Sequence, residues 1–297
     1  MTPGAASHAS HATHDAQNGH VHVHGSSFAD GHPERIAPGD GLWESHLPEH
    51  EQRYEFAAAR LIAGARVLDA GCGVGYGTAL LADRGAGSAI GVDLSAAALE
   101  VARSRFDRPN VRWIREDCVE LREAGRAGPF DLIVNFENLE HVGDPARFLD
   151  RVASLLAPDG VFLVSTPNRT AMNRLHGARP DAPTANPFHE IEFSAAELRD
   201  LLTKRFGSVV LFHQTMDPAE RFLYEPILSL LWSNPFARLG RWVQKTLRGR
   251  HIADRVEDLL PPRAHRIVAE DPGPLLTITM LAECRRPLRP AGPSPRT

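Results

Sequence analysis

Short apolar segments alternate with amphipathic ones through the central part of the chain. The apolar segments are rich in Val, Ile, Leu and Phe, which is typical of strands buried on both faces. The predicted strands are residues 65–70, 88–93, 111–117, 130–136, 160–167, 208–214 and 275–283. Between them apolar residues recur every three or four positions, and the predicted helices are residues 50–63, 76–85, 95–106, 144–157 and 194–206. This alternation favours a mostly parallel sheet with helices on both faces.

Polar residues at the starts of three predicted helices have the chemistry of helix caps. Ser95 precedes one helix and is a predicted N-cap. Pro145 follows Asp144 and suits the first turn of the next helix. Ser194 and Glu197 have the spacing of a capping box at the last predicted helix.

The last two predicted strands are separated by about 60 residues, too many for a structureless loop within a compact domain. We therefore expect an insertion at about 216–273 that contains helices of its own. Residues 1–40 are rich in His, Ala, Gly and Ser, and residues 285–297 are rich in Pro and Arg. Both termini have too few large apolar residues to offset the entropy of ordering, so we predict two disordered tails around a domain at 41–284.

Composition excludes several classes of protein. The formal net charge is −4, whereas a general nucleic-acid-binding protein would carry a basic excess, so we expect no nucleic-acid partner. The three cysteines are Cys72, Cys118 and Cys284, and such a sparse, odd set does not form a disulfide framework. The chain has no run of 18 apolar residues and no signal-peptide pattern at its start. These features predict a cytoplasmic protein.

A glycine-rich segment, VLDAGCGVGYGT, joins the first predicted strand to its helix. Its glycines at 71, 73, 75 and 77 permit a tight turn and a close approach of the backbone to a ligand. A phosphate-binding Walker loop needs a Gly-Lys pair, which the sequence lacks, and the dinucleotide pattern GxGxxG also fails here. The remaining pattern is Asp-x-Gly-x-Gly-x-Gly.

VLDAGCGVGYGTALLA resembles the first motif of class I S-adenosylmethionine-dependent methyltransferases. The segments IGVDLS, REDCVEL, FDLIVNFENLEHV and PDGVFLVSTPN follow in the order that this family shows, and the similarity spans residues 50–215. The resemblance implies an α/β, Rossmann-like, doubly wound sheet of seven strands, mostly parallel with an antiparallel last strand, plus the helical insertion before that strand. It also implies an enzyme that uses S-adenosylmethionine, and it assigns roles to matching positions.

In the glycine-rich segment the resemblance implies contacts with the methionine part of the cofactor. The implied residues are Asp69, Gly71, Cys72, Gly73, Gly75 and Tyr76. Asp93, at the end of the second strand, would accept hydrogen bonds from the ribose hydroxyls, and Leu94 would pack on the adenine.

Asp117 would contact the adenine amino group, with Cys118 beside it. Asn135 and Phe136, at the end of the fourth strand, would flank the sulfonium and the acceptor.

Upstream, EHEQRYEFA resembles a helix found in family members that accompany sugar, lipopolysaccharide or natural-product clusters. By that similarity Arg53 and Tyr54 would approach the cofactor carboxylate. The alternative interpretation is a covering helix with an exposed arginine and a core tyrosine. The sequence leaves both open.

Methyl transfer to a hydroxyl is assisted by a base that removes the proton. The segment ENLEHV offers Glu137, Glu140 and His141 after the fourth strand, where sheets of this kind bind ligands. We interpret His141 as a candidate base because imidazole titrates near neutrality; the alternative is a hydrogen-bonded scaffold histidine.

The segment NPFHEIEFS supplies a second candidate, His189. With Glu190 or Glu192, His189 could bind an acceptor hydroxyl or a metal, and the alternative is a turn histidine pinned by Pro187. Two groups are too few for a metal site, so no metal is predicted. His213 and Gln214, at the end of the sixth strand, could complete the pocket.

Residues 222–250 combine basic, aromatic and aliphatic positions, with no acid between Glu225 and Asp254. This profile fits an interfacial helix that contacts a membrane, for which a lipid-linked glycan would be a natural acceptor. The alternative is a helical lid whose apolar face closes the acceptor pocket.

The leading hypothesis is transfer of a methyl group to a small-molecule acceptor, a hydroxyl of a sugar or of another metabolite. N- or C-methylation of a secondary metabolite or quinone is an alternative. A non-catalytic scaffold that binds S-adenosylmethionine is another, and a metal-handling role for the histidine-rich arm, where His20, His22 and His24 alternate, is a third. The sequence leaves the oligomeric state open.

Overall fold

The computed structural model describes most of the central domain. The described residues are 38, 41–175, 178–184, 186, 188–216, 265–269 and 279–288. The predicted arm at 1–40, apart from Pro38, lies outside the described residues, as do the amphipathic segment 222–250 and the chain after residue 288.

Eight strands and six α-helices form the described fold, with two short 3-10 helices. The strands are β1 (Arg66–Ala70), β2 (Ser88–Asp93), β3 (Val111–Arg115), β4 (Phe130–Phe136), β5 (Leu156–Pro167), β6 (Phe206–Met216), β7 (His265–Val268) and β8 (Thr279–Pro287). The α-helices are α1 (Gly41–Ala58), α2 (Tyr76–Asp83), α3 (Ala96–Arg105), α4 (Pro145–Leu155), α5 (Arg169–Leu175) and α6 (Ala195–Thr203). The 3-10 helices are η1 (Ala124–Ala127) and η2 (Leu139–His141).

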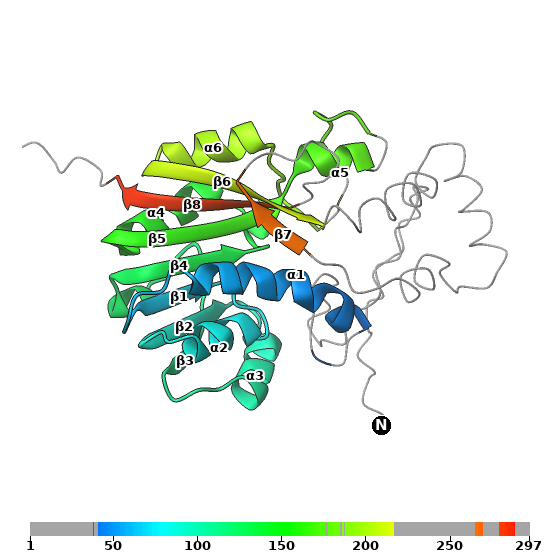
Figure 1. The fold of residues 1–297 in the computed structure, drawn as a ribbon. Helices are drawn as coiled ribbons and strands as arrows, with labels where there is room; N and C mark the ends of the chain where they lie inside the picture. The colour runs from blue at the N-terminus through cyan, green and yellow to red at the C-terminus, as the bar shows by residue number, and fades with distance from the viewer. Residues whose placement is uncertain are drawn as a thin grey trace, which may run out of the picture.

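The strands form one sheet in the order β3-β2-β1-β4-β5-β8-β6-β7 (Figure 1). Strands β1 to β5 pair in parallel, and β8 runs antiparallel to β5 and β6. The predicted Rossmann-like sheet with an antiparallel last strand is therefore confirmed. The strand count differs by one, because β7 adds an antiparallel edge strand to β6. β7 lies inside the insertion where we expected helices, and its four residues were too few for a period to indicate a strand.

The predicted helix caps are present. The Ser95 hydroxyl accepts a hydrogen bond from the backbone N–H of Ala98, and Asp144 caps α4 through the N–H of Arg147. Ser194 and Glu197 form the expected capping box at α6.

Several element boundaries differ from the sequence-based ones. α1 begins at Gly41 and ends at Ala58, with Pro48 inside it, instead of spanning 50–63. β5 begins at Leu156 and not at residue 160, and its register against β4 shifts near this start. β8 continues to Pro287, so the fold includes three residues beyond the predicted end of the domain.

Neighbouring residues on each central strand face opposite sides of the sheet and enter different apolar layers. One layer includes Leu68, Ile133 and Phe162 of the strands with Phe148 of α4 and Leu198 of α6. The opposite layer includes Val67, Leu132 and Leu163 of the strands with Tyr54 of α1 and Leu81 of α2. Burial of each large apolar side chain contributes roughly 1.5–3 kcal/mol, so both layers hold the helices on the sheet.

The order of the strands reverses at β1, which pairs with β2 on one side and with β4 on the other. Ligands of open α/β sheets bind outside the carboxyl ends of the strands at such a point. The glycine-rich segment follows β1, and the segment ENLEHV follows β4. The topology therefore brings these two segments to the same edge of the sheet.

Candidate functional site

The segment between β1 and α2 turns tightly because three glycines adopt positive φ values. These angles are +88° at Gly71, +53° at Gly73 and +90° at Gly75, in a region that residues with a Cβ rarely adopt. The backbone N–H groups of Gly71 and Cys72 donate to the carbonyl of Val92 at 2.8 and 2.9 Å. This anchors the turn to the end of β2.

Asp69 lies beneath this turn and is completely buried. Its carboxylate accepts hydrogen bonds from the Thr78 hydroxyl at 2.6 Å and from the Tyr54 hydroxyl at 3.2 Å. No cationic side chain in the described part of the chain pairs with it. Burial raises the pKa of Asp69 to about 7, because two hydroxyl donors only partly replace the lost water.

Arg53 of α1 is also buried, with 1% of its surface exposed. Its Nη1 donates to Gln214 Oε1 at 3.0 Å and lies 3.8 Å from Glu137 Oε1. Its Nε and Nη2 have no hydrogen-bond partner among the residues that the structure describes. A buried guanidinium with two unpaired donors is costly unless an anion binds it.

The site therefore contains one buried carboxylate without a cation and one buried guanidinium with unpaired donors. Each is complementary to one end of an α-amino acid, whose ammonium carries a positive charge and whose carboxylate carries a negative one. α1 connects the two groups, since Tyr54 follows Arg53 in the helix and its hydroxyl donates to Asp69. This pair of receptors can hold a zwitterion.

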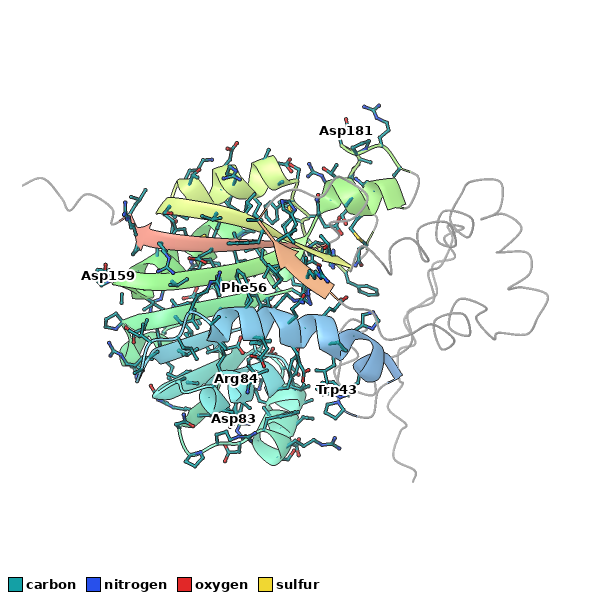
Figure 2. All side chains as sticks on the ribbon, viewed as in Figure 1. Trp43, Phe56, Asp83, Arg84, Asp159 and Asp181 are labelled. Carbon is teal, nitrogen blue, oxygen red and sulfur yellow. The ribbon has the colours of Figure 1, made fainter. Side chains whose placement is uncertain are left out.

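For Tyr54 the sequence left open an approach to the cofactor carboxylate and a place in the core; in the structure Tyr54 is buried and its hydroxyl donates to Asp69. Its ring lies against Gly77, where a Cβ would come within 1.9 Å of Tyr54 Cζ. Gly77 therefore admits the ring and is not part of the turn. Tyr76, predicted to contact the cofactor, packs edge-on against Tyr54 and against Trp43. Figure 2 labels Trp43, which belongs to the N-terminal part of α1.

Asp93, at the end of β2, closes the opposite side of the turn. Its Oδ2 accepts a hydrogen bond from the Gly73 N–H at 2.9 Å, and its Oδ1 accepts one from the Ser95 N–H at 2.8 Å. These two bonds fix the Asp93 carboxylate beside the glycine turn, and its predicted role as a receptor for the ribose diol stays a prediction. The side chain of Leu94, which we expected to pack on adenine, is 65% exposed.

The other predicted adenine contacts lie after β3. Asp117 is exposed, and its Oδ1 accepts from the Val119 N–H at 2.9 Å. Cys118 is partly buried, and burial raises the pKa of its thiol to about 11. Asn138 donates to Cys118 Sγ at 3.6 Å and covers Gly71, where a Cβ would lie 2.6 Å from Asn138 Cγ. The β3 and β4 segments thus both reach the glycine turn.

Asn135 and Phe136 end β4 beside β1. The Asn135 amide donates to the carbonyl of Ala70 at 2.5 Å, and its buried Oδ1 has no partner among the described residues. Phe136 packs edge-on against the Tyr54 ring, with 5.1 Å between the ring centroids. Their predicted position beside a sulfonium and an acceptor stays a prediction.

Glu137 follows in a left-handed conformation, with φ at +47°. For a residue with a Cβ this costs on the order of 1 kcal/mol and persists where the surroundings enforce it. Its backbone N–H donates to both the carbonyl and the hydroxyl of Ser165, at 3.2 and 3.1 Å. Strain of this kind concentrates at functional sites, and no sequence pattern indicated it here.

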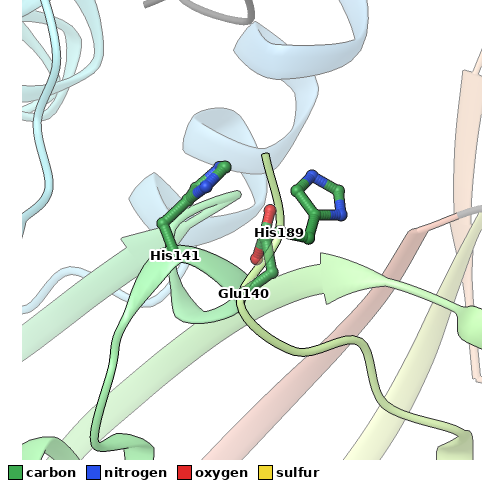
Figure 3. Close-up of side chains that lie close together, drawn as sticks. All are labelled: Glu140, His141 and His189. Atoms are coloured by element: carbon green, nitrogen blue, oxygen red, sulfur yellow. The ribbon is translucent and has the colours of Figure 1, made fainter. Parts of the chain in front are cut away.

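Glu140, His141 and His189 come together at the same edge of the sheet (Figure 3). One ligand atom from each lies within 4.8 Å of the others, so the cluster has the residue types and the compactness to hold a divalent ion. The backbone also joins the two segments, because the N–H groups of Glu190 and Ile191 donate to the carbonyl of Glu140. The two candidate bases predicted from the sequence are thus neighbours.

The hydrogen bonds of His189 define its tautomer. Its Nδ1 lies 2.7 Å from Glu192 Oε1 and therefore carries the proton. Its Nε2 lies 3.0 Å from Asn186 Nδ2, and the Asn186 oxygen accepts from the Phe188 N–H, so the amide nitrogen donates to Nε2. Both ring nitrogens are engaged in this geometry, which favours a structural role for His189 over that of a base.

His141 and Glu140 are held in the same way. His141 Nδ1 donates to the carbonyl of Phe188 at 3.0 Å. Glu140 is 1% exposed and accepts from the Thr166 hydroxyl at 2.9 Å. Burial, with the Glu137 carboxylate adding to it, raises the pKa of Glu140 to about 8, so much of it is protonated at neutral pH.

Three supporting residues carried no recognisable signal or only a faint one in the sequence. Thr78 and Ser165 hold Asp69 and Glu137, and hydroxyl residues within a helix and a strand form no motif by themselves. Gln214, expected only to complete the pocket, ties α1 to β6 through Arg53 and through the carbonyl of Glu49.

Residues 43–211 match a family model described as a methyltransferase domain. A protein of Mycolicibacterium smegmatis named "Probable S-adenosylmethionine-dependent methyltransferase/" is 40% identical over 169 residues, which cover 57% of this chain and 62% of that protein. A ubiquinone biosynthesis O-methyltransferase of Neisseria meningitidis is 38% identical over 117 residues, which cover 39% of this chain and 49% of that protein.

Among solved structures, an S-adenosylmethionine-dependent methyltransferase of Thermotoga maritima has a TM-score of 0.51 and 16% sequence identity. The alignment covers 82% of this chain and 92% of that one, and it supports the fold. None of the helices within the described ranges is long and apolar enough to cross a membrane.

Proposed function

Because the chain belongs to the methyltransferase domain family, we propose that it transfers a methyl group from S-adenosylmethionine to a hydroxyl of a small molecule. The acceptor that we propose is a sugar or another hydroxylated metabolite, and a lipid-linked glycan belongs to that class. The domain that carries the activity spans about 41–284.

Two observations carry the proposal: Arg53 has unpaired donors at Nε and Nη2, and Asp69 has no cationic partner among the described residues. The methionine part of the cofactor is an α-amino acid, and the buried Nε and Nη2 of Arg53 fit its carboxylate. Asp69 lacks a cation and fits its ammonium. Asp93 fits the ribose diol, and the exposed side chain of Leu94 fits the adenine face. Asp117 and Cys118 would then lie on the far side of Asp93 and Leu94, beside the adenine.

The bound cofactor supplies an activated methyl group, so the protein mainly aligns the acceptor and manages its proton. The acceptor would lie where β4 and β5 end, beside Glu137 and the cluster of Glu140, His141 and His189. In the described geometry the cluster fixes the segment around residues 188–191 over this edge. The name of the Neisseria relative, an O-methyltransferase, supports oxygen as the acceptor atom.

Isotope transfer tests this function directly. The protein is incubated with S-adenosylmethionine labelled with ¹³C in the methyl group and with a bacterial extract of polar metabolites and lipids. We expect a labelled product whose methyl carbon has the chemical shift of a methoxy group. Label on nitrogen or carbon would support the alternative acceptors instead, and tight cofactor binding without any labelled product would support the scaffold alternative.

Asp93→Ala is the negative control, because this variant loses the diol receptor and one anchor of the glycine turn. Asp83→Asn is the matched control: Asp83 is an exposed residue of α2 that pairs with Arg108, far from any role in the site. The proposal fails if Asp93→Ala labels the same product as fast as Asp83→Asn does.

A further inference from the structure

Glu137 carries a carboxylate whose two oxygens have different surroundings. Oε1 accepts a hydrogen bond from the Ser165 hydroxyl at 2.7 Å and lies 3.8 Å from Arg53 Nη1. Oε2 accepts no hydrogen bond from any residue within the described ranges, and 21% of the side chain is exposed. The carboxylate is thus fixed at one oxygen and open at the other.

The backbone of Glu137 holds this arrangement in place. Ser165 is buried, its carbonyl and hydroxyl both accept from the Glu137 N–H, and its hydroxyl proton goes to Glu137 Oε1. One side chain of β5 therefore fixes both the left-handed backbone and the carboxylate of Glu137. The conformation is enforced from outside the loop, as expected where a strained residue has a function.

Glu137 also lies between the two halves of the site. Its neighbour Asn138 covers Gly71 of the glycine turn, and Arg53, the proposed receptor for the cofactor carboxylate, lies 3.8 Å from Glu137 Oε1. On the other side, the charge of Glu137 raises the pKa of Glu140, so Glu137 is also close to the cluster of Glu140, His141 and His189. A group in this position borders both the cofactor and the acceptor.

Among the described residues of this edge, Glu140 and His189 are bound by hydrogen bonds within the protein, and His141 uses Nδ1 for the carbonyl of Phe188. Glu140 is buried and bonded to Thr166, and His189 uses its ring nitrogens for Glu192 and Asn186. They hold the segment that covers the site. Glu137 differs from them because it is ordered by its own contacts and still presents a free acceptor oxygen.

We propose that Glu137 is the catalytic residue that binds the acceptor hydroxyl and accepts its proton. The inference rests on the proposed function and deepens it. The acceptor O–H donates to Glu137 Oε2. As the acceptor oxygen forms its bond to the methyl carbon, the carbon–sulfur bond breaks and its electron pair stays on sulfur. The hydroxyl proton passes to Oε2, so the charges of the sulfonium and the carboxylate are both neutralised.

The experiment compares Glu137→Gln and Glu137→Ala with wild type, using the labelled product that wild type forms from S-adenosylmethionine and the bacterial extract. Glu137→Gln keeps the shape but cannot take a proton, so we expect turnover to fall at least 100-fold. Affinity for S-adenosylhomocysteine, measured by calorimetry, should change less than fivefold. Added formate should restore part of the turnover of Glu137→Ala, because formate can occupy the space of the missing carboxylate.

Glu100→Gln is the matched control, an exposed carboxylate of α3, and should keep wild-type turnover without a response to formate. Melting temperatures of all variants show that they fold. Glu137→Gln with more than half of wild-type turnover would overturn the inference. So would a loss of turnover confined to His141→Asn, or the absence of formate rescue. These results leave the proposed function intact, whereas failure of wild type to label any product contradicts the function itself.

Discussion

Binding of the cofactor should release a proton from Asp69 at mildly acidic pH. In the free protein, burial raises the pKa of this carboxyl to about 7, and Tyr54 and Thr78 only partly oppose the shift. An ammonium placed beside the carboxylate stabilises its charged form and lowers the pKa again. The ligand therefore binds the ionised state, and protonation of Asp69 competes with binding.

The magnitude follows from linkage. With a free-protein pKa of about 7, affinity scales with the ionised fraction, so it should rise about 16-fold, or about 1.6 kcal/mol, from pH 5.5 to pH 7.0. At pH 6.0 about 0.9 proton should be released for each ligand bound. Above pH 8 the release from this group should be close to zero.

Calorimetry with S-adenosylhomocysteine measures both quantities, since titration in buffers of different ionisation enthalpy gives the proton count. Asp69→Asn should bind more weakly and lose the dependence on pH, whereas the surface variant Asp83→Asn should keep it. Equal wild-type affinity at pH 5.5 and 7.0 would refute the reasoning. So would an unchanged slope in Asp69→Asn, because another group would then be the one that titrates.

Three further substitutions test the structure around Asp69. Arg53→Met should weaken S-adenosylhomocysteine binding roughly 10- to 100-fold in calorimetry, because it removes charge-assisted bonds to the ligand. The melting temperature of the free protein should not fall, because the substitution also removes a buried, incompletely paired charge. A lower melting temperature with unchanged affinity would contradict it. Gly77→Ala should destabilise the protein by about 1–3 kcal/mol in denaturant unfolding, because its Cβ would overlap Tyr54, whereas Gly143→Ala, with open space around it, should not. Equal effects of the two would contradict the packing. Glu140→Gln should raise the melting temperature more at pH 8 than at pH 5. The pKa of Glu140 is about 8 in the native protein, whereas a glutamate in the unfolded chain ionises near pH 4.3. Wild type therefore loses stability as the pH rises between these values, and the glutamine variant does not. A gain independent of pH would show that Glu140 ionises normally.

The sheet and most of its helices were predictable because their signals are local. Apolar runs, caps such as Ser95 and Ser194, and the ordered motifs together specify a doubly wound sheet. β7 was not predictable, because a strand of four residues at a sheet edge is defined by its pairing with β6. The start of α1 at Gly41 was not predicted because Pro48 lies inside the helix, and a proline usually marks a helix boundary.

In the site, the sequence indicated which residues would gather but not how they would pair. The helical period places Tyr54 on the apolar face of its helix and leaves Arg53 open as an exposed residue. The space above Gly77, which has no Cβ, is what lets the Tyr54 ring reach Asp69. His189 looked available as a base because its partners, Asn186 and Glu192, are bonded to it only after the segment folds back.

Glu137 shows the same limit most clearly. Glu137 lies three residues before Glu140, and nothing in the sequence distinguishes the two glutamates. Their difference arises from tertiary structure: Ser165 enforces a left-handed backbone at Glu137, while burial beside Thr166 keeps Glu140 protonated. A contact from β5 thus decides which of the two carboxylates remains open to a ligand.

A crystal structure of the complex with S-adenosylhomocysteine tests the central claim most directly, namely that Arg53 and Asp69 are the two receptors for the amino-acid part of the cofactor. The account predicts the ligand carboxylate within hydrogen-bond distance of Arg53 Nε and Nη2, the ammonium on Asp69, and the ribose hydroxyls on Asp93. A complex in which the amino-acid part lies elsewhere, with the Arg53 donors still unpaired, would contradict it.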